Sequence, residues 1–313
     1  MDNQRKRELK GATLLMLTSI IWGVAFVFQK TGMEHIGPFA FNFFRCVICI
    51  LFLFAMNFFF SQKSKRSTEL VAEENKYKWY KDKPLITGGL VTGTALFLAM
   101  STQQIGMVST TASKAGFITT MYIVLVPIMG MFYGRKVNGK MWLCVLIAAV
   151  GLYLLSIKEG FVIEKGDFFV FLSAIFFGLQ IIAIDLFAPK ADAIKLSMIQ
   201  FITSGTLSFI AMLFLETVTV QGVMSAGVAI LYTGLFSSGI GFTLQIVAQK
   251  NLQPTVSSLI MSTESGISVI AGVLILGEML TGREILGCII MAVAVVAAQV
   301  KLPKKSGESV KNY

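Results

Sequence analysis

The sequence predicts an all-α integral membrane protein with ten transmembrane helices, arranged as two inverted five-helix repeats. Two features of the composition support the membrane prediction. Only 14% of the 313 residues are charged, whereas a soluble domain carries about 25%. Apolar residues make up 55%, and the mean hydropathy is +0.74. A soluble fold must present polar surface to water, whereas a membrane protein presents apolar surface to lipid, so this composition favours the membrane.

The helix count comes from ten apolar stretches, each of about 20 residues, the length of helix that crosses about 30 Å of hydrocarbon. The stretches must be helical because a single strand would leave its backbone groups unpaired in lipid. They are residues 12–32, 37–60, 84–107, 113–133, 138–157, 166–187, 194–215, 222–247, 253–276 and 282–301.

Lysine and arginine residues predict the orientation. If the N-terminus is cytoplasmic, 21 of these 27 residues fall in predicted cytoplasmic segments and 3 in outer loops. The excess of positive charge on one side predicts a multi-pass protein of the bacterial plasma (inner) membrane with both termini cytoplasmic. It also accounts for the net charge of +10 without a nucleic-acid partner. The first apolar stretch is too long for the core of a signal peptide, so we interpret it as a retained span.

The two halves of the chain resemble each other. Residues 11–45, shifted by 155 positions, fall on residues 166–200 without a gap. Chance matching of glycines is the alternative explanation. Because five spans per half is an odd number, the second half must insert inverted, which places a substrate site between the halves near the membrane midplane. The predicted division is a tail at 1–11, repeats at 12–157 and 158–301, and a basic tail at 302–313.

Five ionisable residues lie inside predicted spans: Lys30, Arg45, Lys114, Asp185 and Glu264. A charge at the centre of a spanning helix costs about 3 kcal/mol or more, so each should face a cavity or a partner. We expect Glu264 to hold a substrate ammonium group or a coupling proton, and Lys114 and Arg45 to bind a carboxylate. The alternatives are structural pairing and, for Lys114, extension to the membrane surface. Lys30 and Asp185 are predicted to be interfacial.

Neutral polar and aromatic residues complete the predicted substrate site. Amides can bind a zwitterion without adding net charge, although they more often form hydrogen bonds between helices. Aromatic residues in spans more often pack against other helices or contact lipid than bind a solute. The candidates for contact with substrate are Gln103, Gln245, Trp22 and Tyr122, with Gln29, Gln104, Gln180, Gln200 and Phe26 as further polar or aromatic neighbours.

The sequence offers no enzyme, metal or cofactor signature. Cys46 and Cys49 form a lone CxxC without a second pair, and His35 is the only histidine. We interpret the cysteines as packing residues. No phosphate-binding loop is present, which argues against direct ATP drive. We therefore expect no catalytic residue, no metal ion and no cofactor.

Several segments form a pattern of spaced Gly, Pro and Glu in apolar sequence. They are Trp22-Gly23, Arg45, Ser113 to Thr119 with Pro127, Gln249-Lys250, Pro254, Glu264, Leu276-Gly277-Glu278 and Gly287-Cys288. Together these segments resemble the drug/metabolite transporter superfamily, EamA type, over about residues 12–300. In that family Glu often follows the glycine that closes span 4, and this chain has Arg135 there. The resemblance implies a ten-helix transporter of metabolites, with a central cavity lined by spans 1, 3, 4, 6, 8 and 9.

These observations predict a secondary transporter, acting as an exporter, that carries amino acids or similar small metabolites across the plasma membrane by alternating access. The alternative is a proton-coupled exporter of lipophilic cations or drugs. The expected partners are a small-molecule substrate and the lipid bilayer, with protons as candidate coupling ions. We expect a monomer rather than a homodimer because one chain contains both halves. A lipid-modifying enzyme and a membrane scaffold are weaker alternatives.

Overall fold

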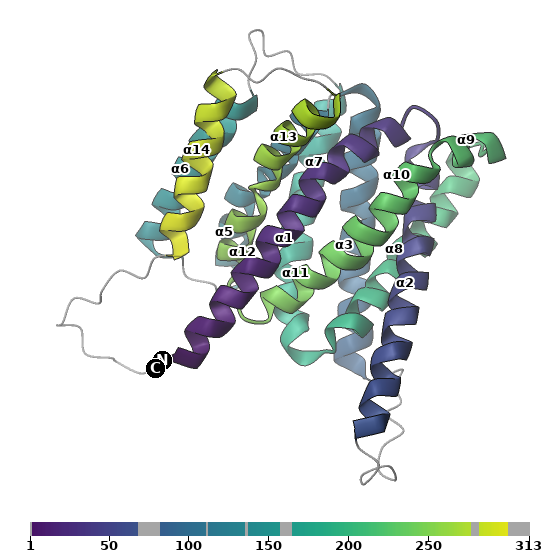
Figure 1. Cartoon of the computed structure of the whole chain (residues 1–313), viewed down its shortest axis with the longest axis horizontal. Helices are drawn as coiled ribbons and strands as arrows, with labels where there is room; N and C mark the ends of the chain where they lie inside the picture. Colours follow the sequence, from purple (N-terminus) through teal and green to yellow (C-terminus); the bar gives the residue numbers. More distant parts are fainter. Residues whose placement is uncertain are drawn as a thin grey trace, which may run out of the picture.

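The computed structural model describes residues 2–67, 82–110, 112–134, 137–156, 165–276 and 282–299. These residues are almost entirely helical and include no strand. The elements, shown in Figure 1, are α1 (Asp2–Gly32), α2 (Pro38–Ser67), α3 (Lys83–Ser109), α4 (Ala112–Thr120), α5 (Tyr122–Phe132), α6 (Gly139–Ser156), α7 (Lys165–Phe187), η2 (Ala188–Lys190), α8 (Ala193–Leu215), α9 (Val220–Ser225), α10 (Gly227–Tyr232), the π-helical segment η3 (Thr233–Gly241), α11 (Phe242–Gln249), α12 (Pro254–Met261), α13 (Glu264–Leu276) and α14 (Gly282–Gln299).

The all-α membrane fold predicted from composition is confirmed. Among the described residues, seven helical segments are long and apolar enough to cross a membrane, and each coincides with a predicted span. The other three predicted spans are also helical, as α6, as α12 with α13, and as α14. The count of ten spans and the inverted repeat stay predictions. The segment 68–81 and the tail 302–313 lie outside the described residues.

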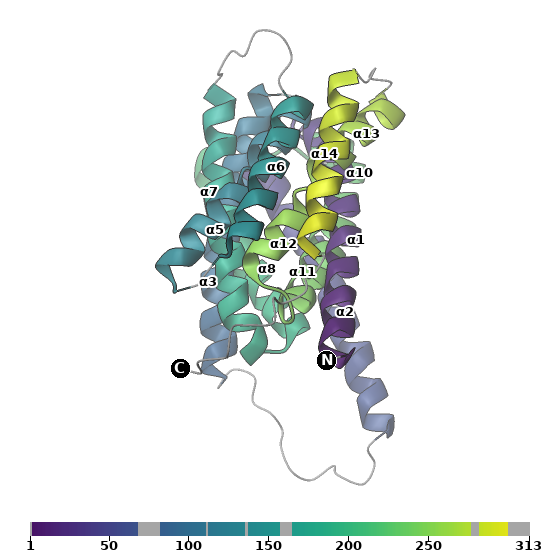
Figure 2. The same cartoon turned by 90° about the vertical axis from the view of Figure 1, so that its left-hand side faces the viewer.

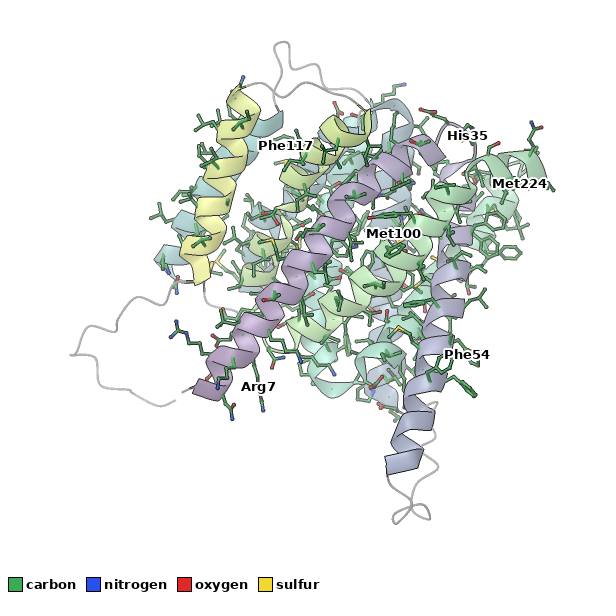
Figure 3. The ribbon with its side chains drawn as sticks, in the orientation of Figure 1. Arg7, His35, Phe54, Met100, Phe117 and Met224 are labelled. Carbon is green, nitrogen blue, oxygen red and sulfur yellow. The ribbon has the colours of Figure 1, made fainter. Side chains whose placement is uncertain are left out.

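One difference from the sequence prediction lies at the N-terminus. The predicted tail at 1–11 is not separate from the first span, because α1 is continuous from Asp2 to Gly32. Lysine, arginine, glutamate and glutamine, which make up most of this tail, are good helix formers, so the helix extends beyond the apolar stretch. Figure 3 shows Arg7 and His35 near opposite ends of α1.

Polar residues define where helices begin. The Asp82 carboxylate accepts a hydrogen bond from the backbone N–H of Leu85, 3.1 Å away, at the start of α3. Asp192 does the same for the backbone N–H of Lys195 at the start of α8, at 3.0 Å. Such caps satisfy N–H groups that have no partner within the helix.

The helices pack in pairs that correspond between the two predicted halves. The third predicted span, α3, contacts the first two helices of the second half, α7 and α8. The eighth predicted span consists of α10, η3 and α11, and it contacts the first two helices of the first half, α1 and α2. α6 and α14 pack against each other at one edge of the molecule, and they remain side by side in both views (Figures 1 and 2). An inverted repeat requires paired contacts of this kind.

Close approach between helices depends on small residues. A Cβ atom on Gly93 of α3 would lie 2.6 Å from the carbonyl oxygen of Gln200 on α8, so a larger residue would force these helices apart. Large apolar side chains cover much of the outer surface instead, and Phe54 points away from the helices (Figure 3). An apolar exterior matches contact with lipid.

Two predicted spans are interrupted near their centres by a non-helical turn. The stretch 113–133 is broken at Met121 between α4 and α5, and the stretch 253–276 is broken at Ser262 and Thr263 between α12 and α13. At each break some backbone N–H groups bond the carbonyl three residues earlier instead of four, as in a single 3₁₀ turn. Hydropathy, averaged over a whole span, does not detect an interruption this short.

Candidate functional site

A small cavity lies where the interrupted helices meet α1, α2, α3, α7 and α11. The space that the centre of a water molecule can occupy is about 40 Å³. Thirteen of the fifteen lining side chains are 5% exposed or less, so the cavity lies in the interior of the helix bundle. The lining residues are Trp22, Phe26, Gln29, Arg45, Met100, Gln103, Thr119, Tyr122, Phe177, Gln180, Ile181, Ser237, Phe242, Gln245 and Glu264.

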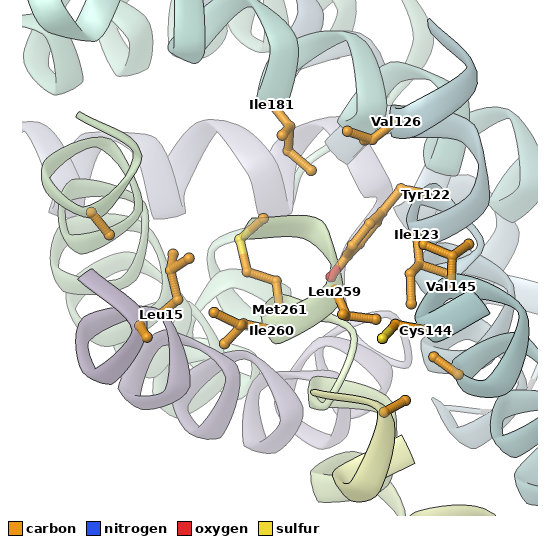
Figure 4. Packing of buried hydrophobic residues seen from close by; sticks show 14 of the residues in the cluster. Leu15, Tyr122, Ile123, Val126, Cys144, Val145, Ile181, Leu259, Ile260 and Met261 are labelled. Atoms are coloured by element: carbon orange, nitrogen blue, oxygen red, sulfur yellow. The ribbon is translucent and has the colours of Figure 1, made fainter. Parts of the chain in front are cut away.

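The two breaks bring one acid and one phenol into contact. Tyr122 is the first residue of α5, and Glu264 is the first residue of α13. The Tyr122 hydroxyl donates a hydrogen bond to Glu264 Oε1 at 2.9 Å, and both side chains are buried. Figure 4 shows Tyr122 reaching from α5 toward Leu259 and Met261 of α12. This hydrogen bond therefore joins the two interrupted spans at the cavity.

Arg45 of α2 supplies a buried positive charge. Its Nε donates to Ser238 Oγ at 3.1 Å, one terminal nitrogen donates to Gln29 Oε1 at 3.3 Å, and the other donates to Ser237 Oγ at 3.3 Å. A guanidinium has five N–H groups, so two have no hydrogen-bond partner among the described residues. Within the described ranges no carboxylate forms an ion pair with Arg45. The site therefore has unused capacity for an anion.

The π-helical segment η3 positions the serines that hold Arg45. Its i→i+5 hydrogen bonding widens the helix, and Ser237 O accepts from both the Phe242 backbone N–H and the Trp22 indole, the latter at 3.1 Å. Gly241 permits this contact, because a Cβ atom there would lie 2.6 Å from Trp22 Nε1. Such π-helical segments occur often at functional sites.

Amides and aromatic rings form the rest of the lining. Gln103 Nε2 donates to Thr119 Oγ1 at 3.0 Å. Gln180 and Gln245 exchange two hydrogen bonds, at 3.4 and 3.2 Å. The Trp22 and Phe242 rings pack with centroids 4.6 Å apart, so polar and aromatic surfaces face the same small space.

Most residues predicted to contact substrate come together here. Six of the seven line the cavity, whereas the Lys114 side chain lies outside the described residues although its backbone belongs to α4. Their role in binding a substrate stays a prediction. The six are Trp22, Arg45, Gln103, Tyr122, Gln245 and Glu264.

The other in-span charges lie elsewhere. The Lys30 ammonium group donates to the carbonyl oxygen of Met107 at 2.8 Å, at the end of α3. Asp185 lines a separate cavity near the start of α1. Sequence reasoning missed Asp167, which is buried and accepts a hydrogen bond from Thr110 Oγ1 at 2.8 Å. Its place one residue after the start of a predicted span concealed its burial.

Serines 237 and 238 were also missed. They occur in a run of glycine, serine and apolar residues, where a serine usually bonds its own helix or packs. Among the described residues no three His, Cys, Asp or Glu side chains form a group suited to a metal ion. Cys46 and Cys49 are free, buried thiols.

The fold and the site together define a multi-pass membrane protein that encloses a polar cavity between interrupted helices. The sequence profile of the EamA-like transporter family matches residues 9–157 and 164–298, and the chain belongs to this family. It is a membrane transporter of the drug/metabolite transporter type, as the sequence motifs predicted.

Similar proteins agree with this assignment. An uncharacterized transporter of Archaeoglobus fulgidus is 29% identical over 298 residues, which cover 92% of this chain and 85% of that protein. A second uncharacterized transporter of the same organism is 26% identical over 174 residues, which cover 56% of this chain and 53% of that protein. A crystal structure with 15% identity has the same fold, with a TM-score of 0.71 over 92% of this chain and 98% of that chain.

Proposed function

We propose that this protein is a secondary transporter that exports an amino acid, or a similar small zwitterionic metabolite, across the bacterial plasma membrane by alternating access. The observation that carries the proposal is the buried cavity that Arg45 and the Glu264–Tyr122 pair both line. We propose further that both termini are cytoplasmic, that the chain acts as a monomer, and that it is not an enzyme.

The chemistry of the lining suits a zwitterion. A charged group enters a low-dielectric site only when it meets partners there. The two N–H groups of Arg45 without a partner would bind the solute carboxylate, and Glu264 would accept hydrogen bonds from the solute ammonium group. Gln103 and Gln245 would bind either end without net charge, and the Trp22 ring would contact an apolar side chain.

The size of the cavity supports a transport cycle rather than a permanently open site. Its 40 Å³ for water centres holds roughly three water molecules. An amino acid is larger, so loading requires the helices around the cavity to separate. Two inverted halves would supply this movement, because rocking one half against the other opens the site to each face in turn. The Tyr122–Glu264 hydrogen bond lies where those halves would meet.

Counterflow in proteoliposomes tests the proposal. Labelled amino acids, amines and sugars are offered with and without a pH gradient. We expect one zwitterionic solute to accumulate, and Arg45→Gln to reduce its uptake about 30-fold, because a charged hydrogen bond contributes about 2 kcal/mol. Lys10→Gln, an exposed change outside the cavity, is the matched control. Uptake by Arg45→Gln equal to that of the control would contradict a carboxylate-binding role.

The aromatic lining supports a second candidate, a proton-coupled exporter of lipophilic cations. A lipophilic cation is attracted to the faces of aromatic rings and to a carboxylate. The cavity lining offers both, from the rings of Trp22, Phe26 and Phe177 and from the acid Glu264. This function needs no cationic residue. Transport of a lipophilic cation that survives both Arg45→Gln and Lys114→Ala would establish it in place of the zwitterion proposal.

A further inference from the structure

A second cavity lies beside the start of α1, at the face of the molecule that carries the N-terminus. It offers about 670 Å³ to the centres of water molecules. Its lining is polar and of mixed charge. The lining residues are Asn3, Gln4, Arg7, Glu8, Asp185, Pro189, Gln249, Lys250, Asn251, Leu252 and Gln253.

This cavity and the central one are lined by neighbouring turns of the same two helices, α7 and α11. Gln249 lines the outer cavity, and Gln245, one turn earlier on α11, lines the central cavity. Gln249 Nε2 donates to the carbonyl oxygen of Ile181 at 3.0 Å, and Ile181 lines the central cavity. A solute that leaves the central cavity toward the N-terminal face at this point must therefore pass these residues.

Four buried amides on α7, α8 and α11 belong to this boundary, because two line the central cavity, one lines the outer cavity and one bonds to Gln180. Gln180 and Gln245 exchange two hydrogen bonds, and Gln180 Nε2 also donates to Gln200 Oε1 at 3.3 Å. Each of the four side chains is 2% exposed or less. The glutamine cluster consists of Gln180, Gln200, Gln245 and Gln249.

The glutamine cluster has unused hydrogen-bonding capacity. Gln200 Nε2, a donor, and Gln249 Oε1, an acceptor, are buried without a partner among the described residues. A barrier that only had to exclude water would be stable with apolar side chains, such as those of Ile184 and Ile246 nearby. Buried polar atoms without partners are uncommon and call for a ligand or another explanation.

We propose that the glutamine cluster is both the gate of the central cavity toward the N-terminal face and a second, transient binding subsite for the polar group of the solute. When the gate opens, the Gln180–Gln245 hydrogen bonds break, and the freed amides bind a solute that carries both donors and acceptors. The subsite part of this inference rests on the proposed transport function, whereas the gate part does not.

The gate is tested by chemical access to the central cavity, without transport. A single cysteine replaces Thr119 in a background where the four native cysteines are changed to alanine or serine. A membrane-impermeant thiol reagent is added to one face of oriented vesicles at a time. We expect Gln180→Ala to speed labelling from the N-terminal face at least tenfold, because it removes both hydrogen bonds to Gln245.

Gln104→Ala is the matched control, since Gln104 is a fully buried amide of α3 outside the cluster. Labelling of Gln180→Ala at the rate of Gln104→Ala, or acceleration from the opposite face only, would overturn the gate. This result stands whether or not a transported solute has been found.

The subsite is tested with Gln249→Met, which keeps a side chain of similar length and removes both the free acceptor and the Nε2 donor to the Ile181 carbonyl. We expect solute counterflow to fall about tenfold while solute affinity, measured on the detergent-solubilised protein, stays within twofold, because the central cavity is intact. Unchanged counterflow in Gln249→Met would overturn the subsite, and failure of every variant and the wild type to move any solute would instead contradict the proposed function.

Discussion

The two interrupted spans reach the same geometry with different residues. α4–α5 breaks at Met121, after a short helix whose Thr120 hydroxyl bonds the Phe117 carbonyl. α12–α13 breaks at Ser262, in a run of buried serines whose hydroxyls bond carbonyls three residues earlier. Hydroxyls that bond their own backbone compete with regular helix and tend to bend it.

The chemistry at the two breaks differs as well. The first presents the neutral phenol Tyr122, and the second presents the carboxylate Glu264. Interrupted spans expose free backbone N–H groups inside the membrane, where they attract polar solutes. The comparison teaches that similar backbone geometry in the two halves does not imply similar function. The carboxyl group of this pair comes from the second half, and the hydroxyl that donates a hydrogen bond to it comes from the first.

Removing the charge from the second break should have the largest effect. Glu264→Gln keeps the shape of the side chain and a hydrogen-bond partner for Tyr122, but it removes the negative charge. We expect counterflow of a zwitterion to fall about 100-fold, because a buried charged hydrogen bond contributes up to about 3 kcal/mol. Transport and pH-gradient response equal to those of wild type would show that Glu264 has no coupling or ammonium-binding role.

Altering the first break should have an intermediate effect. Tyr122→Phe removes the hydroxyl that bonds Glu264 Oε1 at 2.9 Å and leaves the ring in place. We expect counterflow to fall about fivefold to tenfold, since one hydrogen bond contributes about 1 to 1.5 kcal/mol. The same assay measures this. A loss as large as that of Glu264→Gln would mean that both breaks contribute equally, and the proposed asymmetry would be wrong.

The smallest effect should come from the serines that shape the second break. Ser262→Ala removes a buried hydroxyl that bonds the Leu259 carbonyl at 2.8 Å. We expect the free energy of unfolding to change by no more than about 1 kcal/mol, with transport unchanged. Thermal unfolding in detergent and counterflow measure the two quantities. A severe loss of transport with normal stability would assign the hydroxyl a direct role at the cavity.

The helical architecture was largely predictable, because each predicted span is a long apolar stretch that lipid forces into helix. The position of Arg45 and Glu264 beside a polar cavity was also predictable, because an ionisable residue within a span must face a polar space. The interruptions at Met121 and Ser262 were not, because a single 3₁₀ turn leaves the hydropathy of a span unchanged. The π-helical register around Ser237 depends on packing against α1 and α2, which no local sequence pattern encodes.

The length of α3 has a consequence for the surrounding lipid. α3 contains 27 residues and is about 40 Å long at 1.5 Å per residue. The hydrocarbon layer is about 30 Å thick, so α3 either tilts or extends beyond the layer at its ends. The acyl-chain length of the host lipid should therefore act on the tilt of α3, because a thicker layer lets this helix stand closer to the membrane normal.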